Sequence, residues 1–381
     1  MRRLRALSLL LTCLGCETLI GADFDDAKRR PVASVDGGAD AAEEAGSCDN
    51  ARPPKPPDVT GAGGDTRFSI VLHELYFGEG KDAQDKPDYF NVGFDIDGVC
   101  AGHGQAPKCS ADFTGADPTD GPHGEDNGVG RMLFEQDSAF GTKVVSGEFV
   151  SKSIRDGAYA PFGFIEVGGY NSFSEDDELE VTWSVALATQ VTPSGSFVPK
   201  LDGSDPWPLA DAVQIGGTAG NPIQYKSTRA YANKRRLVAY FEEAIVPLAN
   251  VYFQAKKLIL TGDLDYDPID QIWNLSDGLV AGYSESDELL AIVPQITTQF
   301  LGVPLCTDNA SYKSTKAFIC RNADHATGAL EPGKPCDASS FAIRFESVNA
   351  VAGEVGMFPP PKAKCPAATD PSTDSCTIPV K

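Results

Sequence analysis

Short runs of β-branched and aromatic residues, bounded by Gly, Asp, Asn and Pro, make up most of the chain from Phe68 onward. The run 178–189 alternates apolar and polar positions with period two over most of its length, as a half-buried strand requires. We therefore predict strands rather than helices for this part of the chain. The predicted strands are residues 68–77, 89–96, 143–154, 162–167, 178–189, 237–245, 251–260 and 341–345.

A different periodicity begins at Ser286. This residue can cap a helix, and the acidic pair Asp287 and Glu288 suits the first turn of one. The pattern predicts a helix over residues 286–300, which Pro294 kinks or ends. A second helix is expected over residues 308–322. The apolar face of the first helix consists of Leu289, Leu290, Ile292, Val293 and Ile296.

Turn signals recur between the predicted strands, and this is typical of an antiparallel sandwich. We predict a mainly β fold, a jelly-roll-like antiparallel β-sandwich over residues 66–357. The two helices form a small helical insertion at residues 284–335. Residues 358–381 are Pro-rich and contain Cys365 and Cys376, which predicts a disulfide-stapled tail.

The first fifteen residues read as a signal peptide. Arg2, Arg3 and Arg5 precede an apolar run that ends near Cys13. That run is shorter than the roughly 20 residues that a membrane-spanning helix needs, and suits a cleaved export signal. The protein is therefore expected outside the cytoplasm.

Gly15 and Cys16 follow the apolar run and resemble the lipobox of bacterial lipoproteins, because a small residue directly before the cysteine suits the signal peptidase. The resemblance implies that Cys16 is the lipid attachment site. The alternative is Cys13, although Thr12 suits the cleaved bond less well. Buried acyl methylenes contribute about 0.8 kcal/mol each, so two or more chains hold a protein on a membrane. Glu17 in place of Asp favours the outer membrane, on its periplasmic or cell-surface face.

Residues 16–65 are rich in Asp, Ala, Gly and Pro, and such a segment buries too little apolar area to fold. We predict a disordered acidic and Pro-rich tether. The chain carries 32 basic and 54 acidic residues, and removal of residues 1–15, with three Arg, leaves 29 against 54, a net charge of −25. This charge argues against binding to nucleic acid, and leaves an extracellular glycan or protein ligand open.

Eight cysteines follow Cys16, and an even number in an exported chain favours disulfides over zinc. No pair has the C-x-x-C spacing of common zinc sites. Closure of short loops suggests Cys100 with Cys109, Cys306 with Cys320 and Cys365 with Cys376. These pairings would leave Cys48 for Cys336.

The first of two acidic clusters predicts a calcium site. Calcium takes six to eight hard oxygen ligands on loops that glycine allows to wrap tightly. The alternative is a solvated acidic loop. No organic cofactor is indicated. The candidate calcium ligands are Asp95, Asp97, Asp120, Asp126 and Asn127.

The second cluster, residues 263–270, resembles the start of an EF-hand loop, but Pro268 and Asn274 stand where that loop requires Gly and Glu. We interpret it as the acidic end of a strand. The chain contains neither H-E-x-x-H nor G-x-S-x-G, and we assign no catalytic residue.

Three weaker alternatives involve histidine or tryptophan. His103 and His123 with Asp126 offer a transition-metal set, and His73 with Glu74 an acid-base pair. Most such histidines are structural. The tryptophans could stack on a sugar, although core positions need no such role. They are Trp183, Trp207 and Trp273.

Several segments together resemble predicted lipoproteins of myxobacterium-like Gram-negative bacteria. The resemblance implies a location and no activity. We expect a non-enzymatic structural or ligand-binding lipoprotein, and the alternative is a secreted hydrolase of glycans or another extracellular polymer. The segments are the lipobox cysteine, ETLIGADF at 17–24, DIDG at 95–98, residues 120–127 and CDASSFAI at 336–343.

Overall fold

A computed structural model describes residues 51–103, 105–110, 118–140, 145–191, 196–328, 335–358 and 364–377. The predicted signal peptide, both candidate lipid-bearing cysteines, Cys48 and most of the predicted tether lie outside these ranges. The described residues belong to one compact unit, Ala39–Lys381.

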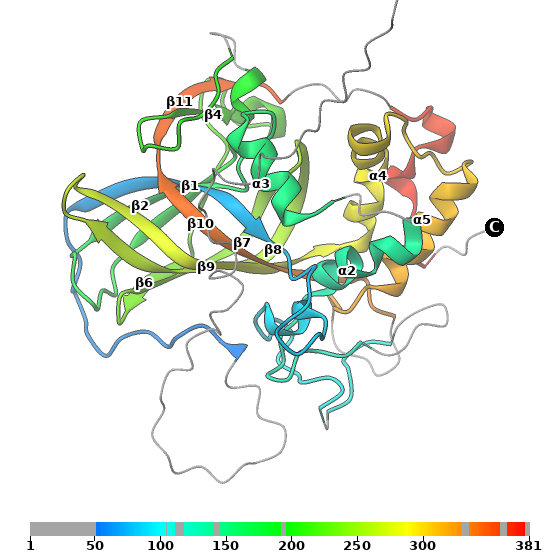
Figure 1. Cartoon of the computed structure of the whole chain (residues 1–381), viewed down its shortest axis with the longest axis horizontal. Coiled ribbons are helices and arrows are strands. Elements are labelled where there is room, and N and C mark those ends of the chain that lie inside the picture. The colour runs from blue at the N-terminus through cyan, green and yellow to red at the C-terminus, as the bar shows by residue number, and fades with distance from the viewer. Residues whose placement is uncertain are drawn as a thin grey trace, which may run out of the picture. The chain divides into compact units, whose positions relative to one another are not determined.

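A nine-stranded antiparallel sheet forms the centre of this unit (Figure 1). Its order is β5-β3-β2-β1-β10-β9-β8-β7-β6. The mainly β prediction is confirmed. The strands are β1 Thr66–Tyr76, β2 Phe164–Tyr170, β3 Glu180–Ser184, β5 Gln224–Lys226, β6 Arg229–Asn233, β7 Arg236–Leu248, β8 Val251–Asp267, β9 Ile272–Glu285 and β10 Ala338–Asn349.

The sheet curls until its two ends meet. The backbones of Asp176, just before β3, and Ala232 in β6 exchange two hydrogen bonds of 3.0 and 2.7 Å. The indole nitrogen of Trp183 in β3 donates to the carbonyl of Ile245 in β7 at 3.2 Å. Opposite walls of the curled sheet therefore pack face to face and enclose a common core.

Aromatic side chains fill that core. The Trp183 ring lies edge-on to Phe162 at 5.9 Å and to Phe241 at 6.2 Å. Trp183 and Trp207 are fully buried, which makes both of them core residues rather than sugar-stacking surfaces. A short parallel pair, β4 Pro206–Ala210 and β11 Val351–Gly356, adds a second sheet.

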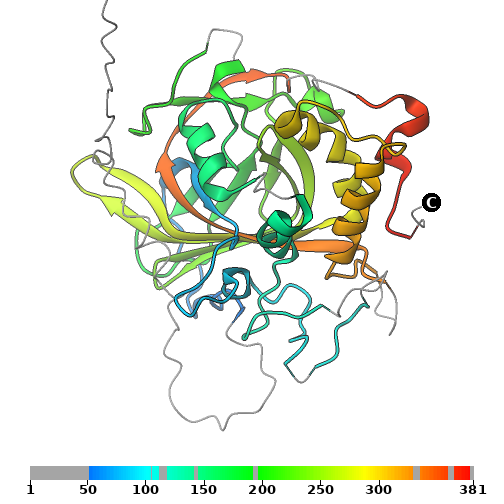
Figure 2. The ribbon, with the colours of Figure 1, turned by 45° about the vertical axis from the view of Figure 1, so that its right-hand side comes forward.

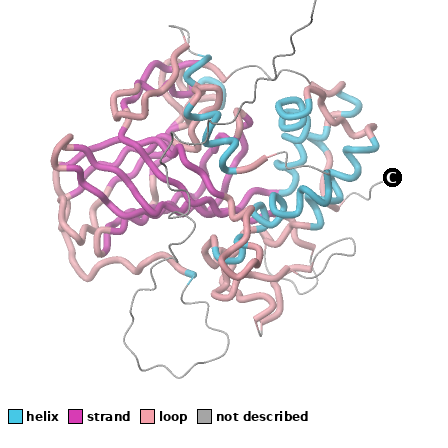
Figure 3. Tube along the Cα trace, viewed as in Figure 1, coloured by secondary structure: helices cyan, strands magenta, loops and turns pink. Residues whose placement is uncertain are grey.

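Four helices belong to the described chain: α2 Gly128–Phe140, α3 Gly147–Arg155, α4 Ser286–Leu301 and α5 Ala310–Arg321. The last two confirm the predicted helices, and Pro294 lies inside α4 without ending it. Figure 3 shows α2, α4 and α5 gathered at one end of the sheet. Within the described chain, no helix combines the length and apolarity needed to cross a membrane.

Two predicted strands are wrong. Residues 147–155 form α3 instead. Ser146 caps the first turn of this helix, because its side chain accepts a hydrogen bond from the Phe149 amide. Residues 88–91 form the short 3-10 helix η2, Asp88–Asn91, and the following loop lies on the outer face of the sheet. There Val92 and Phe94 pack against Leu279 and Ala281 of β9 and Ala342 of β10.

The cysteines form disulfides, but not the predicted pairs. Cys109 bonds to Cys336 across a sequence separation of 227 residues, and Cys100 is also disulfide-bonded. Each of the four predicted pairings includes a cysteine that bonds to a different partner, so all four are wrong. Preference for short loops misled the prediction, because tertiary contacts decide which thiols meet. The other pairs are Cys306–Cys365 and Cys320–Cys376.

Both of these pairs hold the C-terminal tail against α4 and α5, where Figures 1 and 2 show the tail beside these helices. The tail contains the 3-10 helices η5, Ala367–Thr369, and η6, Pro371–Thr373. Asp374 accepts from the buried Lys316 ammonium at 2.5 Å and from the Tyr312 hydroxyl at 2.9 Å. Disulfides and a buried ion pair thus fix the tail together.

Candidate functional site

Three aspartates meet where the loop after η2 crosses the segment before α2. Asp95, Asp97 and Asp126 each offer a carboxylate oxygen, and these oxygens lie within 4.8 Å of one another. The Asp95 side chain is 0% exposed and Asp126 is 4% exposed. Three of the five predicted calcium ligands therefore come together, and we call them the Asp triad.

Backbone hydrogen bonds fix the two segments of the Asp triad. Phe94 and Asp126 form an antiparallel bridge, in which the Asp126 amide donates to the Phe94 carbonyl at 3.1 Å. Oδ2 of Asp126 accepts from the amides of Ile96 at 2.6 Å and Asp97 at 3.2 Å. The tight approach needs glycine, since a Cβ at Gly93 would lie 2.8 Å from the Asp126 carbonyl oxygen.

The DIDG sequence turns its own carboxylates inward. Oδ1 of Asp95 accepts from the Gly98 amide, and Oδ1 of Asp97 accepts from the Val99 amide at 2.8 Å. Such Asx turns are typical of Asp two or three residues before the donor. Gly98 has a φ of 78°, in the left-handed region that glycine adopts without strain.

One buried oxygen of the Asp triad, Oδ2 of Asp95, accepts no hydrogen bond within the described part of the chain, and Nη2 of Arg52 lies 3.6 Å from it. That distance is too long for a hydrogen bond. A buried carboxylate oxygen without a donor is costly unless a cation or proton reaches it. The Asp triad thus has the charge and the free oxygen that a cation site needs.

Two further carboxylates surround the Asp triad. Oδ2 of Asp120 accepts from the Ala101 amide at 2.6 Å, and its side chain hydrogen-bonds that of Asp126. Asp324 comes from the loop after α5, and its two oxygens accept from the amide and hydroxyl of Ser340 at 2.7 and 2.5 Å. Asp120 is adjacent to the Asp triad but outside it, and no sequence pattern around Asp324 indicates that it joins this cluster.

Burial and mutual repulsion raise the pKa of every carboxyl group in this cluster for which a shift is resolved. Burial, then the charges of Asp97 and Asp324, raise the pKa of Asp120 to about 7. Burial raises the pKa of Asp324 to about 6. Burial, followed by the charge of Asp120, holds the pKa of Asp126 well above its usual range, and burial also raises that of Asp97. A cation would relieve the repulsion that disfavours the ionised forms.

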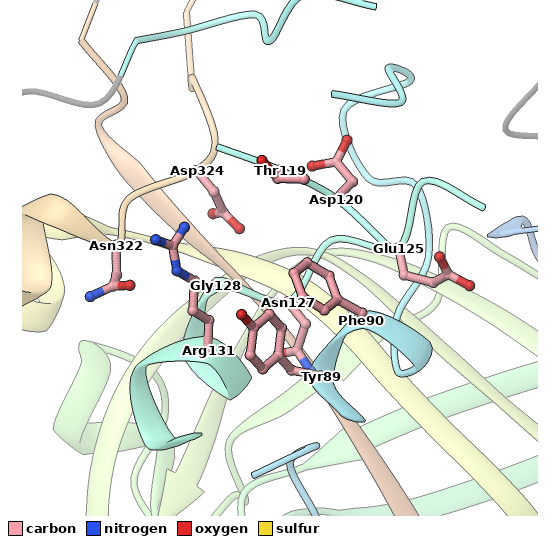
Figure 4. Close-up of a pocket in the computed structure, with 10 residues that line it drawn as sticks. All are labelled: Tyr89, Phe90, Thr119, Asp120, Glu125, Asn127, Gly128, Arg131, Asn322 and Asp324. Carbon is pink, nitrogen blue, oxygen red and sulfur yellow. The ribbon is translucent and has the colours of Figure 1, made fainter. Parts of the chain in front are cut away.

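A small pocket opens beside this cluster, and Figure 4 shows the Arg131 guanidinium in it between Asn322 and Asp324. Its free volume is about 10 Å³. Roughly 10–15 Å³ holds one water molecule, so the enclosed part of the pocket has room for about one water. Its lining residues are Tyr89, Phe90, Thr119, Asp120, Glu125, Asn127, Gly128, Arg131, Asn322 and Asp324.

Asn127 has another role than the predicted one. Its Oδ1 accepts from the Gly130 amide at 2.9 Å and the Ala342 amide at 3.1 Å, and its Nδ2 donates to the Phe77 carbonyl at 3.0 Å. Both lone pairs of the amide oxygen are therefore used. Asn127 caps the start of α2 and ties it to β10, and we remove it from the ligand set.

The histidine sets do not assemble as proposed. Within the described ranges, the Asp triad is the one group of three or more potential metal-ligating side chains this close together, so His103, His123 and Asp126 form no such group. Nε2 of His103 instead lies 3.1 Å from the Asp120 carbonyl oxygen.

His73 and Glu74 lie close, with Nδ1 3.5 Å from Oε1, but Arg155 also pairs with this carboxylate. Burial alone would raise the pKa of Glu74. Hydrogen bonds from His73 and Arg155 outweigh that effect and lower the pKa. Glu74 is therefore held ionised, as in a structural ion pair.

The second acidic cluster is the end of β8, which runs to Asp267, as the strand interpretation predicts. Asp263 pairs with Arg236 at 3.0 Å, and Oδ1 of Asp267 accepts from the Ile269 amide at 2.7 Å. Trp273 lies at this end as well, half-buried and in contact with Tyr170 and Tyr266 at ring distances of 5.1 and 4.9 Å.

Comparison with known proteins gives no assignment: no protein-family model, no curated protein and no solved structure matches the chain. The functional argument therefore depends on the residues of the site itself.

Proposed function

We propose that this chain is an exported, lipid-anchored protein whose β-rich body binds calcium at Asp95, Asp97 and Asp126 and has a non-enzymatic structural or ligand-binding role. The observation that carries the calcium site is the Asp triad, in which one buried carboxylate oxygen accepts no hydrogen bond in the described chain. Oxygen-rich, acidic sites suit calcium better than softer metals.

The role proposed for the ion is to join two segments that have little regular structure. Asp95 and Asp97 belong to the loop after η2, and Asp126 precedes α2. Val92 and Phe94 of the same loop cover apolar residues of β9 and β10. A bound ion would therefore hold this cover on the sheet, and so stabilise the folded state alone.

Sequence and disulfides support the proposed location. The cationic start, the apolar run and Gly15–Cys16 match an export signal with a lipid site. The three described disulfides fit an oxidising compartment outside the cytoplasm. The resemblance to lipoproteins of myxobacterium-like bacteria supports the same location, and the outer membrane remains part of the proposal.

The alternative function, hydrolysis of an extracellular polymer, has no comparable support. The pocket beside Asp120 and Asp324 has carboxyl groups with raised pKa values, as an acid catalyst would need. However, the enclosed free volume of this pocket is about 10 Å³, the space of a single water molecule. We therefore favour an ion that stabilises structure.

The test is the effect of calcium on thermal unfolding. We expect chelator to lower the Tm of the purified full-length protein and added calcium to restore it, because a ligand of the folded state alone adds stability. In Asp126→Asn the Tm should no longer respond to calcium. Since burial already disfavours the charge of Asp126, this isosteric change should leave the calcium-free Tm equal or higher.

The matched control is Asp270→Asn, which removes the same charge from the exposed end of the β8–β9 hairpin. This variant should keep the full calcium response. A Tm of the unaltered protein that ignores both chelator and calcium would refute the proposed site.

A further inference from the structure

The first described residues form a segment that lies against the β-rich body of the protein. Residues 51–65 precede β1, in a range that the sequence assigns to the tether. The Ala51 carbonyl accepts from the Asp95 amide at 2.9 Å. Further along, the carbonyls of Pro54 and Lys55 accept from the side chains of Tyr231 and Asn233 in β6, at 2.5 and 2.8 Å. We call residues 51–55 the docked segment.

The docked segment brings a positive charge to the Asp triad. Nη2 of Arg52 lies 3.6 Å from Oδ2 of Asp95, the buried oxygen that accepts no hydrogen bond in the described chain. The Arg52 side chain is 55% exposed, whereas that of Asp95 is 0% exposed. The guanidinium therefore approaches the site from the solvent side.

We infer that the Arg52 guanidinium competes with calcium for the Asp95 carboxylate. Because Arg52 belongs to the docked segment, this competition couples calcium affinity to the position of that segment. The inference rests on the proposed calcium site. It adds regulation: calcium binding and the Arg52 contact with Asp95 oppose each other.

Geometry makes the two states incompatible. Calcium bonds oxygen at roughly 2.3–2.6 Å, so an ion on Oδ2 of Asp95 would lie at most about 6 Å from Nη2 of Arg52 in its present position. At such a distance a divalent ion and a guanidinium repel strongly near a protein surface. Either Arg52 moves into solvent or the ion binds more weakly.

Thermodynamic linkage makes the opposition reciprocal. If Arg52 weakens calcium binding by some factor, calcium weakens the Arg52–Asp95 contact by the same factor. The backbone bond between Ala51 and Asp95 is adjacent to this contact, so calcium would loosen the point at which the N-terminal segment meets the body.

The experiment compares calcium affinities of two charge-neutralised variants in the full-length protein. Arg52→Gln should bind calcium about threefold to tenfold more tightly than the unaltered protein, measured by calorimetric titration at low salt. Lys55→Gln removes the same charge from the same segment, but its exposed side chain lies further along the chain. Its calcium affinity should change by less than about twofold.

Salt separates direct competition from a structural role of Arg52. At about 1 M salt the Debye length falls to about 3 Å, so the gain of Arg52→Gln over the unaltered protein should shrink. Equal affinities of the unaltered protein and Arg52→Gln, or equal gains in both variants, would overturn the inference and leave the calcium site standing. Absence of calcium binding in all three proteins would overturn the calcium site itself.

Discussion

His325 is the residue whose environment opposes its charge most clearly. It is 4% exposed, its ring stacks on Tyr283 at 4.3 Å, and its Nδ1 accepts no hydrogen bond in the described chain. Burial, followed by repulsion from Lys257, lowers its pKa from 6.5 to about 4. The folded protein therefore holds His325 neutral over a pH range in which the unfolded chain takes up a proton.

This shift predicts a loss of stability in mild acid. Since the folded pKa is the lower one, the contribution of His325 is complete above about pH 6.5 and is lost as the pH falls towards 4, by about 3 kcal/mol in total. His325→Phe keeps a ring on Tyr283 without the titration. We expect the difference in unfolding free energy between the two proteins, measured with urea in chelator, to fall across this range.

A difference that stays constant between pH 7 and 4 would contradict the prediction. The difference is the right quantity because the carboxyl groups around the Asp triad titrate in both proteins. Their raised pKa values act in the opposite sense, so that their penalty grows as the pH rises.

Site residues that interact with their neighbours in the sequence were predictable, and those that interact with distant residues were not. Asp95 and Asp97 form turns with their own neighbours, and the DIDG pattern indicates these turns. Asp324 joins the cluster through Ser340 and the chain fold, and no neighbouring residue signals it. Asn127 was misassigned because an amide suits a helix cap and a metal site equally well in sequence.

Among the elements, those with a long, regular pattern were predictable. The apolar face of α4 and the alternation of β3 were found, and residues of β7 and β8 were predicted to form strands. α3 was missed although its buried residues Gly147, Val150, Ser151 and Ile154 have helical spacing, because its β-branched residues favoured a strand. β9 was missed because Asn, Ser, Asp and Gly interrupt it, and pairing with β8 and β10 stabilises it instead.

The hairpins depend on turns that sequence rules do not favour. Lys234 and Arg235 join β6 to β7 with φ values of 51° and 67°. Two positive φ values usually require Asn or Gly. Contacts of the Arg235 side chain offset the strain of its positive φ: its guanidinium donates to the Leu264 carbonyl and lies 5.8 Å from the Trp273 ring centre. Lys234 is exposed to solvent, and its side chain has no contact of this kind to offset the strain of its positive φ within the described chain.

Lys234→Asn should therefore stabilise the protein. Asn adopts the left-handed region with less strain, so we expect a gain of about 0.5–1 kcal/mol in the free energy of unfolding, measured with urea. Lys200→Asn is the control, because it makes the same change at an exposed residue without a positive φ. If both variants gain equally, the effect comes from charge and the turn explanation fails.

At the scale of the molecule, disulfides connect segments that the sheet topology separates. Cys109 lies in the chain between Asp97 and Asp126 of the Asp triad, and Cys336 lies two residues before β10. The pair Cys306–Cys365 instead fixes the tail near α4 and α5. The two disulfides therefore restrain different parts of the molecule, although each links distant residues.

This division predicts different effects on calcium binding. Cys109→Ser with Cys336→Ser should loosen the segment that joins Asp97 to Asp126, and so weaken calcium affinity by about tenfold while costing about 2–4 kcal/mol of stability. Cys306→Ser with Cys365→Ser should leave the affinity within about twofold, since the loop keeps its restraint. Calorimetric titration at a temperature where both variants are folded measures the difference. Equal affinities would mean that the remaining restraints, the Cys100 disulfide and backbone hydrogen bonds such as those from Ile96 and Asp97 to Asp126, suffice to hold the Asp triad together.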